Sequence, residues 1–194
     1  IYNLLLTIST AGIPVALSRL ISAALATGKL RQVKRIHAVA LPAFTVVGAA
    51  FTALMFVFAR QLGELMGDYE ITACVRTLSP AVLFCCIISV YRGYSQGFED
   101  MIPTAISQIM EVLCKLVFGL TIAWIFLRQG YGTPTISAGA IAGVTIGLGL
   151  AIPILVFYKR RLDKKSVLEN AGYDDAPLSR SETLKMIFKI SIPI

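Results

Sequence analysis

Long stretches of this chain carry no charged residue, and this feature restricts its fold more than any other. Asp, Glu, Lys and Arg are absent from residues 1–18, 37–59, 77–91 and 129–158. Two of these runs exceed the roughly 20 apolar residues that a helix needs to cross a bilayer. Charged residues make up only 15% of the 194 residues, against about 25% in soluble globular domains. The sequence therefore excludes an ordinary soluble domain and predicts an all-α, polytopic transmembrane helix bundle.

Apolar runs and turn residues divide the chain into five membrane segments and the start of a sixth. Ser79 followed by Pro80 is typical of a helix start, with an N-cap and a proline in the first turn. The polar stretch 60–76 is long enough for a short surface helix. The expected membrane segments are residues 1–27, residues 37–59, a third helix from Ser79 towards residue 97, residues 103–127 and residues 135–158.

The basic residues predict an orientation, because Lys and Arg favour cytoplasmic loops. If the loop after the first segment lies inside, thirteen of the 18 basic residues lie inside and three lie outside, while two fall within segments. The inside set is Lys29, Arg31, Lys34, Arg35, Arg92, Lys159, Arg160, Arg161, Lys164, Lys165, Arg180, Lys185 and Lys189, and the outside set is Arg60, Arg76 and Arg128. This bias agrees with five helices that alternate strictly across the membrane.

A hydrophilic linker separates the five segments from the last one. Residues 163–181 are polar, and residues 182–189 resemble an amphipathic lead-in to a further membrane helix. We expect five transmembrane helices in residues 1–158, a cytoplasmic linker in residues 159–183 and the start of the next transmembrane helix in residues 184–194. The chain begins inside an apolar segment without Met and stops inside another, which predicts a fragment of a longer protein.

The fourth segment carries a polar stripe. Thr104, Gln108, Glu111, Lys115 and Gly119 follow one another at intervals of 4, 3, 4 and 4 residues, which places them on one face of an α-helix. An ionisable residue at this depth usually faces a bundle interior or a wet cavity. Glu111 and Lys115 also stand in the favourable i, i+4 order. The stripe is therefore either a cavity wall or a self-neutralised pair that joins helices.

The first segment has a second polar stripe, formed by Asn3, Thr7, Thr10, Pro14, Ser18 and Ser22. Gly12 and Pro14 loosen this helix midway. Arg19 lies nine residues before Gly28, so its side chain either extends to the cytoplasmic interface or lines a cavity and binds an anion. A guanidinium suits phosphate because it stays charged and binds in a bidentate manner.

The fifth segment has small residues at every fourth position, Gly139, Gly143 and Gly147. This spacing forms a flat groove on one helical face, against which a neighbouring backbone packs closely. Packing is the default interpretation, and a face that slides during transport is the alternative.

Catalytic and metal motifs are missing from the sequence. There is no Ser-His-Asp set, HExxH, GxSxG or P-loop, and His37 is the only histidine, interpreted as an interfacial residue. The four cysteines cannot form a zinc set with it and are interpreted as buried or lipid-facing thiols. The net charge of +7 comes from short clusters beside apolar runs, which favours topology over nucleic-acid binding. We expect no cofactor, no metal, no nucleic-acid partner and no enzymatic activity.

Residues 12–36 and residues 90–120 carry a family resemblance, most specifically the sequence Arg92-Gly93-Tyr94-Ser95-Gln96-Gly97 and the run 101–108. They resemble the stage V sporulation protein B and MurJ-like lipid II flippase group of the multidrug/oligosaccharidyl-lipid/polysaccharide exporter superfamily. The resemblance implies one lobe of a two-lobe alternating-access transporter in the bacterial cytoplasmic (inner) membrane. Residues 1–158 would form helices of the N-terminal lobe and residues 184–194 would begin the second.

The resemblance implies translocation of a lipid-linked saccharide, such as a peptidoglycan precursor or a polysaccharide repeat unit. Its expected partners are a lipid-linked oligosaccharide, membrane lipids and a coupling cation. Arg19 and Lys115 are the candidates for the anionic headgroup, with Gln108 on the same stripe. Glu111 would tune Lys115 or carry the cation, and it departs from a purely cationic cavity. The alternatives are a cation-coupled multidrug exporter of the same superfamily, a membrane-embedded transferase and a structural subunit.

Overall fold

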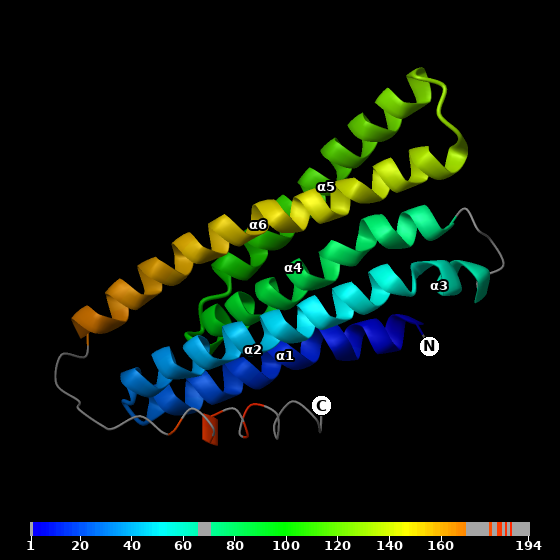
Figure 1. The fold of residues 1–194 in the computed structure, drawn as a ribbon. Helices are drawn as coiled ribbons and strands as arrows, with labels where there is room; N and C mark the ends of the chain where they lie inside the picture. The colour runs from blue at the N-terminus through cyan, green and yellow to red at the C-terminus, as the bar shows by residue number, and fades with distance from the viewer. Residues whose placement is uncertain are drawn as a thin grey trace. The chain divides into compact units, whose positions relative to one another are not determined.

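A computed structural model describes residues 2–65 and 71–169, together with residues 179, 182, 183, 185 and 187. The regular elements of this described part are all helical, which confirms the expected all-α class (Figure 1). They are α1 (Tyr2–Ala26), α2 (Leu30–Val57), the short α3 (Ala59–Leu65), α4 (Ile71–Gly97), α5 (Ile102–Arg128) and α6 (Thr133–Glu169).

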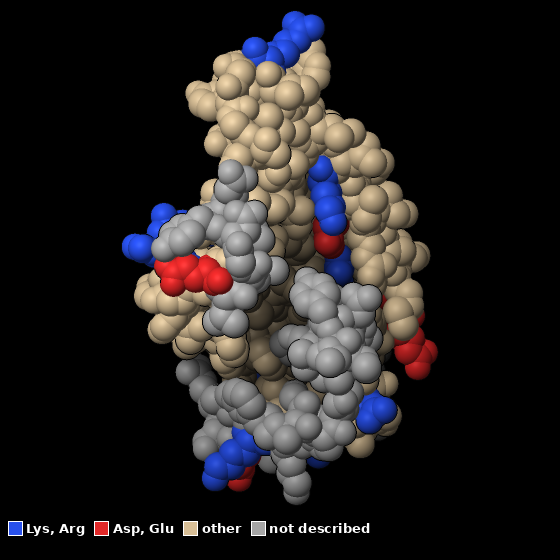
Figure 2. All heavy atoms as spheres, turned by 90° about the vertical axis from the view of Figure 1, so that its right-hand side faces the viewer, with Lys and Arg blue, Asp and Glu red and all other residues tan. Residues whose placement is uncertain are grey.

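Four helices are long and apolar enough to cross a membrane: Leu30–Val57, Thr72–Gly97, Ile102–Arg128 and Thr133–Lys164. Within α1, Pro14–Ala26 is a shorter apolar helix. Among the described residues on the face drawn in Figure 2, those that are neither basic nor acidic predominate. Many large apolar side chains of α2 and α5 are exposed, as expected where lipid replaces water. The chain is thus a multi-pass membrane protein.

The turn between α1 and α2 is shorter than expected. Gly28 has a positive φ of 71°, and its nitrogen donates to the Leu25 carbonyl at 2.9 Å. The Lys29 nitrogen donates to the Ala24 carbonyl at 2.9 Å, which completes a Schellman helix end. Because α2 starts directly at Leu30, most of the basic cluster lies in its first turns rather than in a loop.

The expected helix start at Ser79 and Pro80 is wrong. The helix α4 begins at Ile71 and continues through both residues. The Ser79 hydroxyl donates to the Val75 carbonyl at 2.8 Å, and the Ser79 carbonyl accepts from the Thr52 hydroxyl of α2 at 3.0 Å. Side chains of the same and neighbouring helices can re-satisfy backbone groups near a proline in a membrane helix. The proline therefore marks the interior of a helix here.

The fifth predicted segment is also longer in the structure than in the sequence pattern. The helix α6 extends past residue 158 to Glu169 and passes through Pro153. Residues 159–169, expected as the first part of the linker, are therefore helical. An ion pair of 2.9 Å between Lys159 and Asp163, one turn apart, stabilises this polar extension.

The chain divides into two compact units. The first unit contains residues 1–44, 87–105 and 154–194, and the second contains residues 45–86 and 106–153. The core of the first unit is a cluster from α1, α2 and α4 that includes Leu17, Ile21, Ile36 and Val90. All described members of the predicted inside basic set fall in the first unit, and Arg60, Arg76 and Arg128 fall in the second. The orientation of the helices across the membrane stays a prediction.

Candidate substrate-binding site

The polar stripe of the fourth segment lies on α5, as the residue spacing predicts. Gln108, Glu111 and Lys115 belong to the second unit and to one uninterrupted helix. Gln108 and Lys115 are exposed, Glu111 is half-buried and Gly119 is buried. The structure therefore brings three of the four predicted site residues together on one helical segment.

The glycine face of α6 packs against the backbone of this segment. A Cβ atom at Gly147 would lie 2.9 Å from the Glu111 carbonyl oxygen and 3.3 Å from the Lys115 nitrogen. A Cβ atom at Gly143 would overlap the Gly119 nitrogen and lie 3.0 Å from the Lys115 carbonyl oxygen. The prediction of close helix packing at these glycines is confirmed. It also shows that α6 sets the position of the α5 backbone that carries Glu111 and Lys115.

Apolar side chains surround the exposed part of the stripe. Ile109, Val112 and Leu116 are each more than half exposed on α5. An ammonium group on such a surface is unfavourable in hydrocarbon unless a polar partner or water meets it. Lys115 is therefore an exposed cation among exposed apolar side chains of α5.

Arg19 lies on α1 and belongs to the first unit. Its side chain is exposed, while Leu17, Leu20 and Ile21 around it are buried. A site that combines Arg19 with Lys115 stays a prediction.

Part of the second polar stripe has a packing role. A Cβ atom at Gly93 of α4 would lie 2.9 Å from the Pro14 carbonyl oxygen, and one at Gly97 would lie 3.2 Å from the Ser18 carbonyl oxygen. Pro14 and Ser18 thus face the α4 backbone and do not form a cavity wall there. The side chains of Asn3, Thr7 and Thr10 lie outside the described part of the chain. These contacts also explain the two glycines of the sequence 92–97, which let α1 approach α4.

The same motif carries a cluster that sequence reasoning missed. His37 of α2 is buried, and its ring lies 5.2 Å from the Tyr91 ring and 4.9 Å from the Tyr94 ring. The expectation of an interfacial histidine does not describe this buried environment. The Tyr94 hydroxyl donates to Asp163 of α6, and the Lys159 ammonium lies 5.8 Å from the Tyr94 ring centroid.

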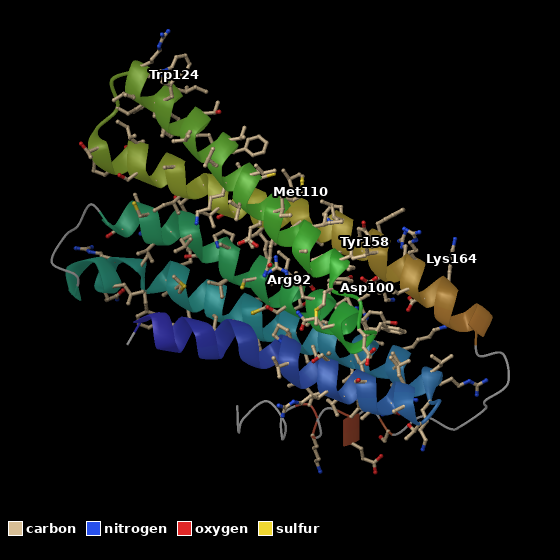
Figure 3. All side chains as sticks on the ribbon, turned by 180° about the vertical axis from the view of Figure 1, so that it is seen from behind. Arg92, Asp100, Met110, Trp124, Tyr158 and Lys164 are labelled. Carbon is tan, nitrogen blue, oxygen red and sulfur yellow. The ribbon has the colours of Figure 1, made fainter. Side chains whose placement is uncertain are left out.

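This cluster joins three helices of the first unit through polar groups. The neighbouring side chain of Lys164 projects away from α6 (Figure 3). The only signals in the sequence were the Lys159 and Asp163 spacing of four residues and the tyrosines at positions 91 and 94. Neither signal predicts which residue of another helix is contacted. Within the described residues, no group of three or more His, Cys, Asp or Glu side chains could hold a metal ion.

Comparisons with known proteins agree with these observations. Residues 1–174 match the family described as polysaccharide biosynthesis protein. "Stage V sporulation protein B" of Bacillus subtilis (strain 168) is 29% identical over 189 residues, covering 96% of this chain and 36% of that protein. "Lipid II flippase MurJ" of the same organism is 26% identical over 201 residues, covering 97% of this chain and 36% of that protein.

A further relative, "Uncharacterized membrane protein YabM" of B. subtilis, is 24% identical over 189 residues, covering 96% of this chain and 34% of that protein. The chain thus spans about a third of the length of the curated relatives it matches. No solved structure matches the chain. Because the family match covers most of its residues, this multi-pass helical chain belongs to the polysaccharide biosynthesis protein family.

Proposed function

We propose that the protein translocates a lipid-linked saccharide across the bacterial cytoplasmic membrane by alternating access, without covalent chemistry. The family match and the relative named as a lipid II flippase support this proposal. The observation that carries it is the position of Lys115 in α5. It stands 13 residues after Ile102 and 13 before Arg128, or roughly 20 Å from either helix end. A cation at mid-membrane depth usually marks a substrate or ion path.

The saccharide carrier lipid would present phosphate groups, which suit basic side chains. In this proposal Lys115 and Arg19 contact the anionic headgroup, and Gln108 adds amide hydrogen bonds. Glu111 tunes Lys115 or holds a coupling cation. A peptidoglycan precursor or a polysaccharide repeat unit would meet these requirements.

The proposed domain organisation follows from the same family. Residues 1–158 supply helices of an N-terminal lobe, residues 159–183 connect the lobes on the cytoplasmic side, and residues 184–194 begin the second lobe. Rocking of the two lobes about a midplane site would expose the headgroup to each side in turn. Gly12 and Pro14 within α1, and the glycine face that α6 presents to α5, would permit such movement.

A flipping assay with the full-length protein in vesicles tests this function. The vesicles contain a fluorescent lipid-linked oligosaccharide, and transport is measured by its protection from an impermeant quencher. Wild type should flip this lipid and should not export a cationic dye from the same vesicles. Absence of flipping together with dye export would replace the proposal with the multidrug exporter.

Arg19 provides the sharpest test of the headgroup contact. Arg19→Ala should lower the flipping rate by about 10- to 100-fold, because a hydrogen bond to a charged group is lost. Arg19→Lys should be impaired less, since it keeps the charge and loses the bidentate fork. Arg60→Ala is the matched control, because Arg60 pairs with Glu64 on the short helix α3. Full transport by Arg19→Ala would refute the headgroup role of this residue.

A further inference from the structure

The second unit contains a pocket at one end of three helices. Its volume is about 470 Å³, within the range of pockets that hold small molecules and cofactors. Its walls come from the first turns of α4 and α6 and from the last turns of α5. The lining includes Thr77 of α4, Ile122 and Phe126 of α5, and Thr135, Ala138 and Ala142 of α6.

The pocket wall suits hydrocarbon. Most of its lining side chains are apolar, and the Thr77 hydroxyl already donates to the Ala73 carbonyl within its own helix at 2.9 Å. The Thr77 carbonyl accepts from the Thr145 hydroxyl at 3.1 Å. Both polar groups of Thr77 are thus used inside the protein. A ligand in this pocket gains mainly from burying apolar surface.

Glycine shapes one side of the pocket. A Cβ atom at Gly139 would lie 2.8 Å from the Phe126 ring and 2.9 Å from the Ile122 side chain. The absence of a side chain at Gly139 lets α6 approach these two residues closely. Ala138 and Ala142, with their small side chains, leave the remaining space open.

Two arginines stand at the same helix ends as the pocket. Arg128 is the last residue of α5, two positions after Phe126, and its guanidinium lies 4.3 Å from the Trp124 ring centroid. Arg76 directly precedes Thr77 on α4, with its guanidinium 5.9 Å from the Phe56 ring centroid. Figure 3 shows Trp124 near the end of α5. Trp and basic residues at the ends of membrane helices lie at the level of lipid headgroups.

We propose that this pocket binds one acyl chain of an anionic phospholipid, whose phosphate is held by Arg128 and Arg76. The argument is charge complementarity beside an apolar pocket: guanidinium groups bind phosphate in a bidentate manner. A neutral lipid or an apolar protein segment would bring no negative charge to the level of these two arginines. The site is separate from the stripe at mid-membrane, since it lies at the helix ends where a bilayer phospholipid carries its headgroup.

The test uses the full-length protein in nanodiscs that contain phosphatidylglycerol with a photoreactive diazirine on one acyl chain. After irradiation, labelled peptides are mapped by mass spectrometry. Labels should concentrate on residues 122–126 and 135–142. Ala138→Phe fills the pocket and should reduce labelling there by about tenfold. Ser137→Phe is the matched control, because Ser137 is the exposed neighbour outside the pocket lining, and it should label like wild type.

The headgroup contact is tested by comparing this probe with a phosphatidylcholine probe that carries the same chain. Wild type should label several-fold more strongly with phosphatidylglycerol, and Arg76→Gln with Arg128→Gln should remove the difference. Arg60→Gln is the control, because Arg60 is a basic residue of the same unit that pairs with Glu64. This variant should keep the difference in labelling between the two lipids. Each variant must retain the wild-type melting temperature. A variant that fails this requirement is replaced by Ala142→Leu for the pocket or by single arginine changes for the headgroup.

Several results would overturn the proposal. Equal labelling by the two lipids would show that the site does not select an anionic headgroup. Labelling unchanged by Ala138→Phe would show that the acyl chain does not occupy the pocket. Displacement of the probe by polyprenyl phosphate but not by unlabelled phosphatidylglycerol would assign the pocket to the transported lipid instead. A photoreactive amino acid in place of Ile125 that crosslinks to protein rather than to lipid would show that another helix or a second copy fills the space.

Discussion

The Tyr94 hydroxyl of α4 donates a hydrogen bond of 2.5 Å to Oδ1 of Asp163 on α6. The other carboxylate oxygen of Asp163 forms an ion pair with the Lys159 ammonium at 2.9 Å. One carboxylate thus fastens the polar extension of α6 to α4 and pairs with a cation on its own helix. This arrangement gives a physical role to a tyrosine in the most specific family motif of the sequence.

Tyr94→Phe should lower the free energy of unfolding by about 1–3 kcal/mol, because it removes the hydrogen bond that the Tyr94 hydroxyl donates to Oδ1 of Asp163, while the ion pair with Lys159 remains. The measurement is the melting temperature in detergent, followed by tryptophan fluorescence. Tyr131→Phe is the control, since it removes a hydroxyl from an exposed tyrosine that keeps its ring contact with Phe126. Strictly additive effects of Tyr94→Phe and Asp163→Ala would contradict a direct interaction between these residues.

Gly143→Ala should destabilise the protein by about 1–3 kcal/mol, because the added methyl group overlaps the α5 backbone and must push the helices apart. Gly149→Ala is the matched control on the same helix, since its Cβ would meet only the Phe84 ring, at an ordinary 3.8 Å. Thermal stability in detergent measures both. Equal melting temperatures for the two variants would show that α5 and α6 are not packed through Gly143.

Lys115→Ala should reduce lipid flipping by about 10- to 100-fold if Lys115 contacts the headgroup. If Lys115 instead forms a structural pair with Glu111, the same variant reduces activity through the fold, because it removes one member of the pair. The double variant Glu111→Gln with Lys115→Gln removes both charges and separates these cases. Continued inactivity with a wild-type melting temperature supports the headgroup contact. Recovery of most of the activity would show instead that the two residues form a structural pair.

Gln129→Cys should react with an impermeant thiol reagent on intact cells, and Lys164→Cys should react only after the membrane is opened. The reason is the bias of thirteen inside to three outside basic residues. Both positions are exposed, whereas the neighbouring Asp163 is engaged by Tyr94 and makes a poor reporter. The native cysteines are replaced in the background protein. Labelling of Lys164→Cys on intact cells would reverse the orientation.

Much of the fold could be predicted from local patterns. Uncharged runs of membrane length predicted the long helices because backbone groups in hydrocarbon must be satisfied within the segment. The four-residue glycine spacing on α6 predicted a packing face, and the 4-3-4-4 spacing on α5 predicted a shared helical face. Each of these signals depends on residues within one helix.

Helix ends were harder to predict where partners on other helices stabilise them. Ser79 and Pro80 read as a helix start, yet α4 begins at Ile71 and continues through both, and Ser79 is hydrogen-bonded to Val75 and to Thr52 of α2. The polar residues after position 158 read as a linker, yet Asp163 holds them in α6 through Lys159 and Tyr94.

By itself the sequence determined an all-helical, multi-pass membrane protein, the faces of its helices and the places of Glu111 and Lys115 within α5, because these follow from hydropathy and helical periodicity. The tertiary structure decided which backbone the glycines meet, that His37 is buried between tyrosines of α4, and that Tyr94 reaches Asp163 across 69 positions of sequence. Contacts between helices depend on how several faces pack at once, and no spacing within one helix encodes the partner on another.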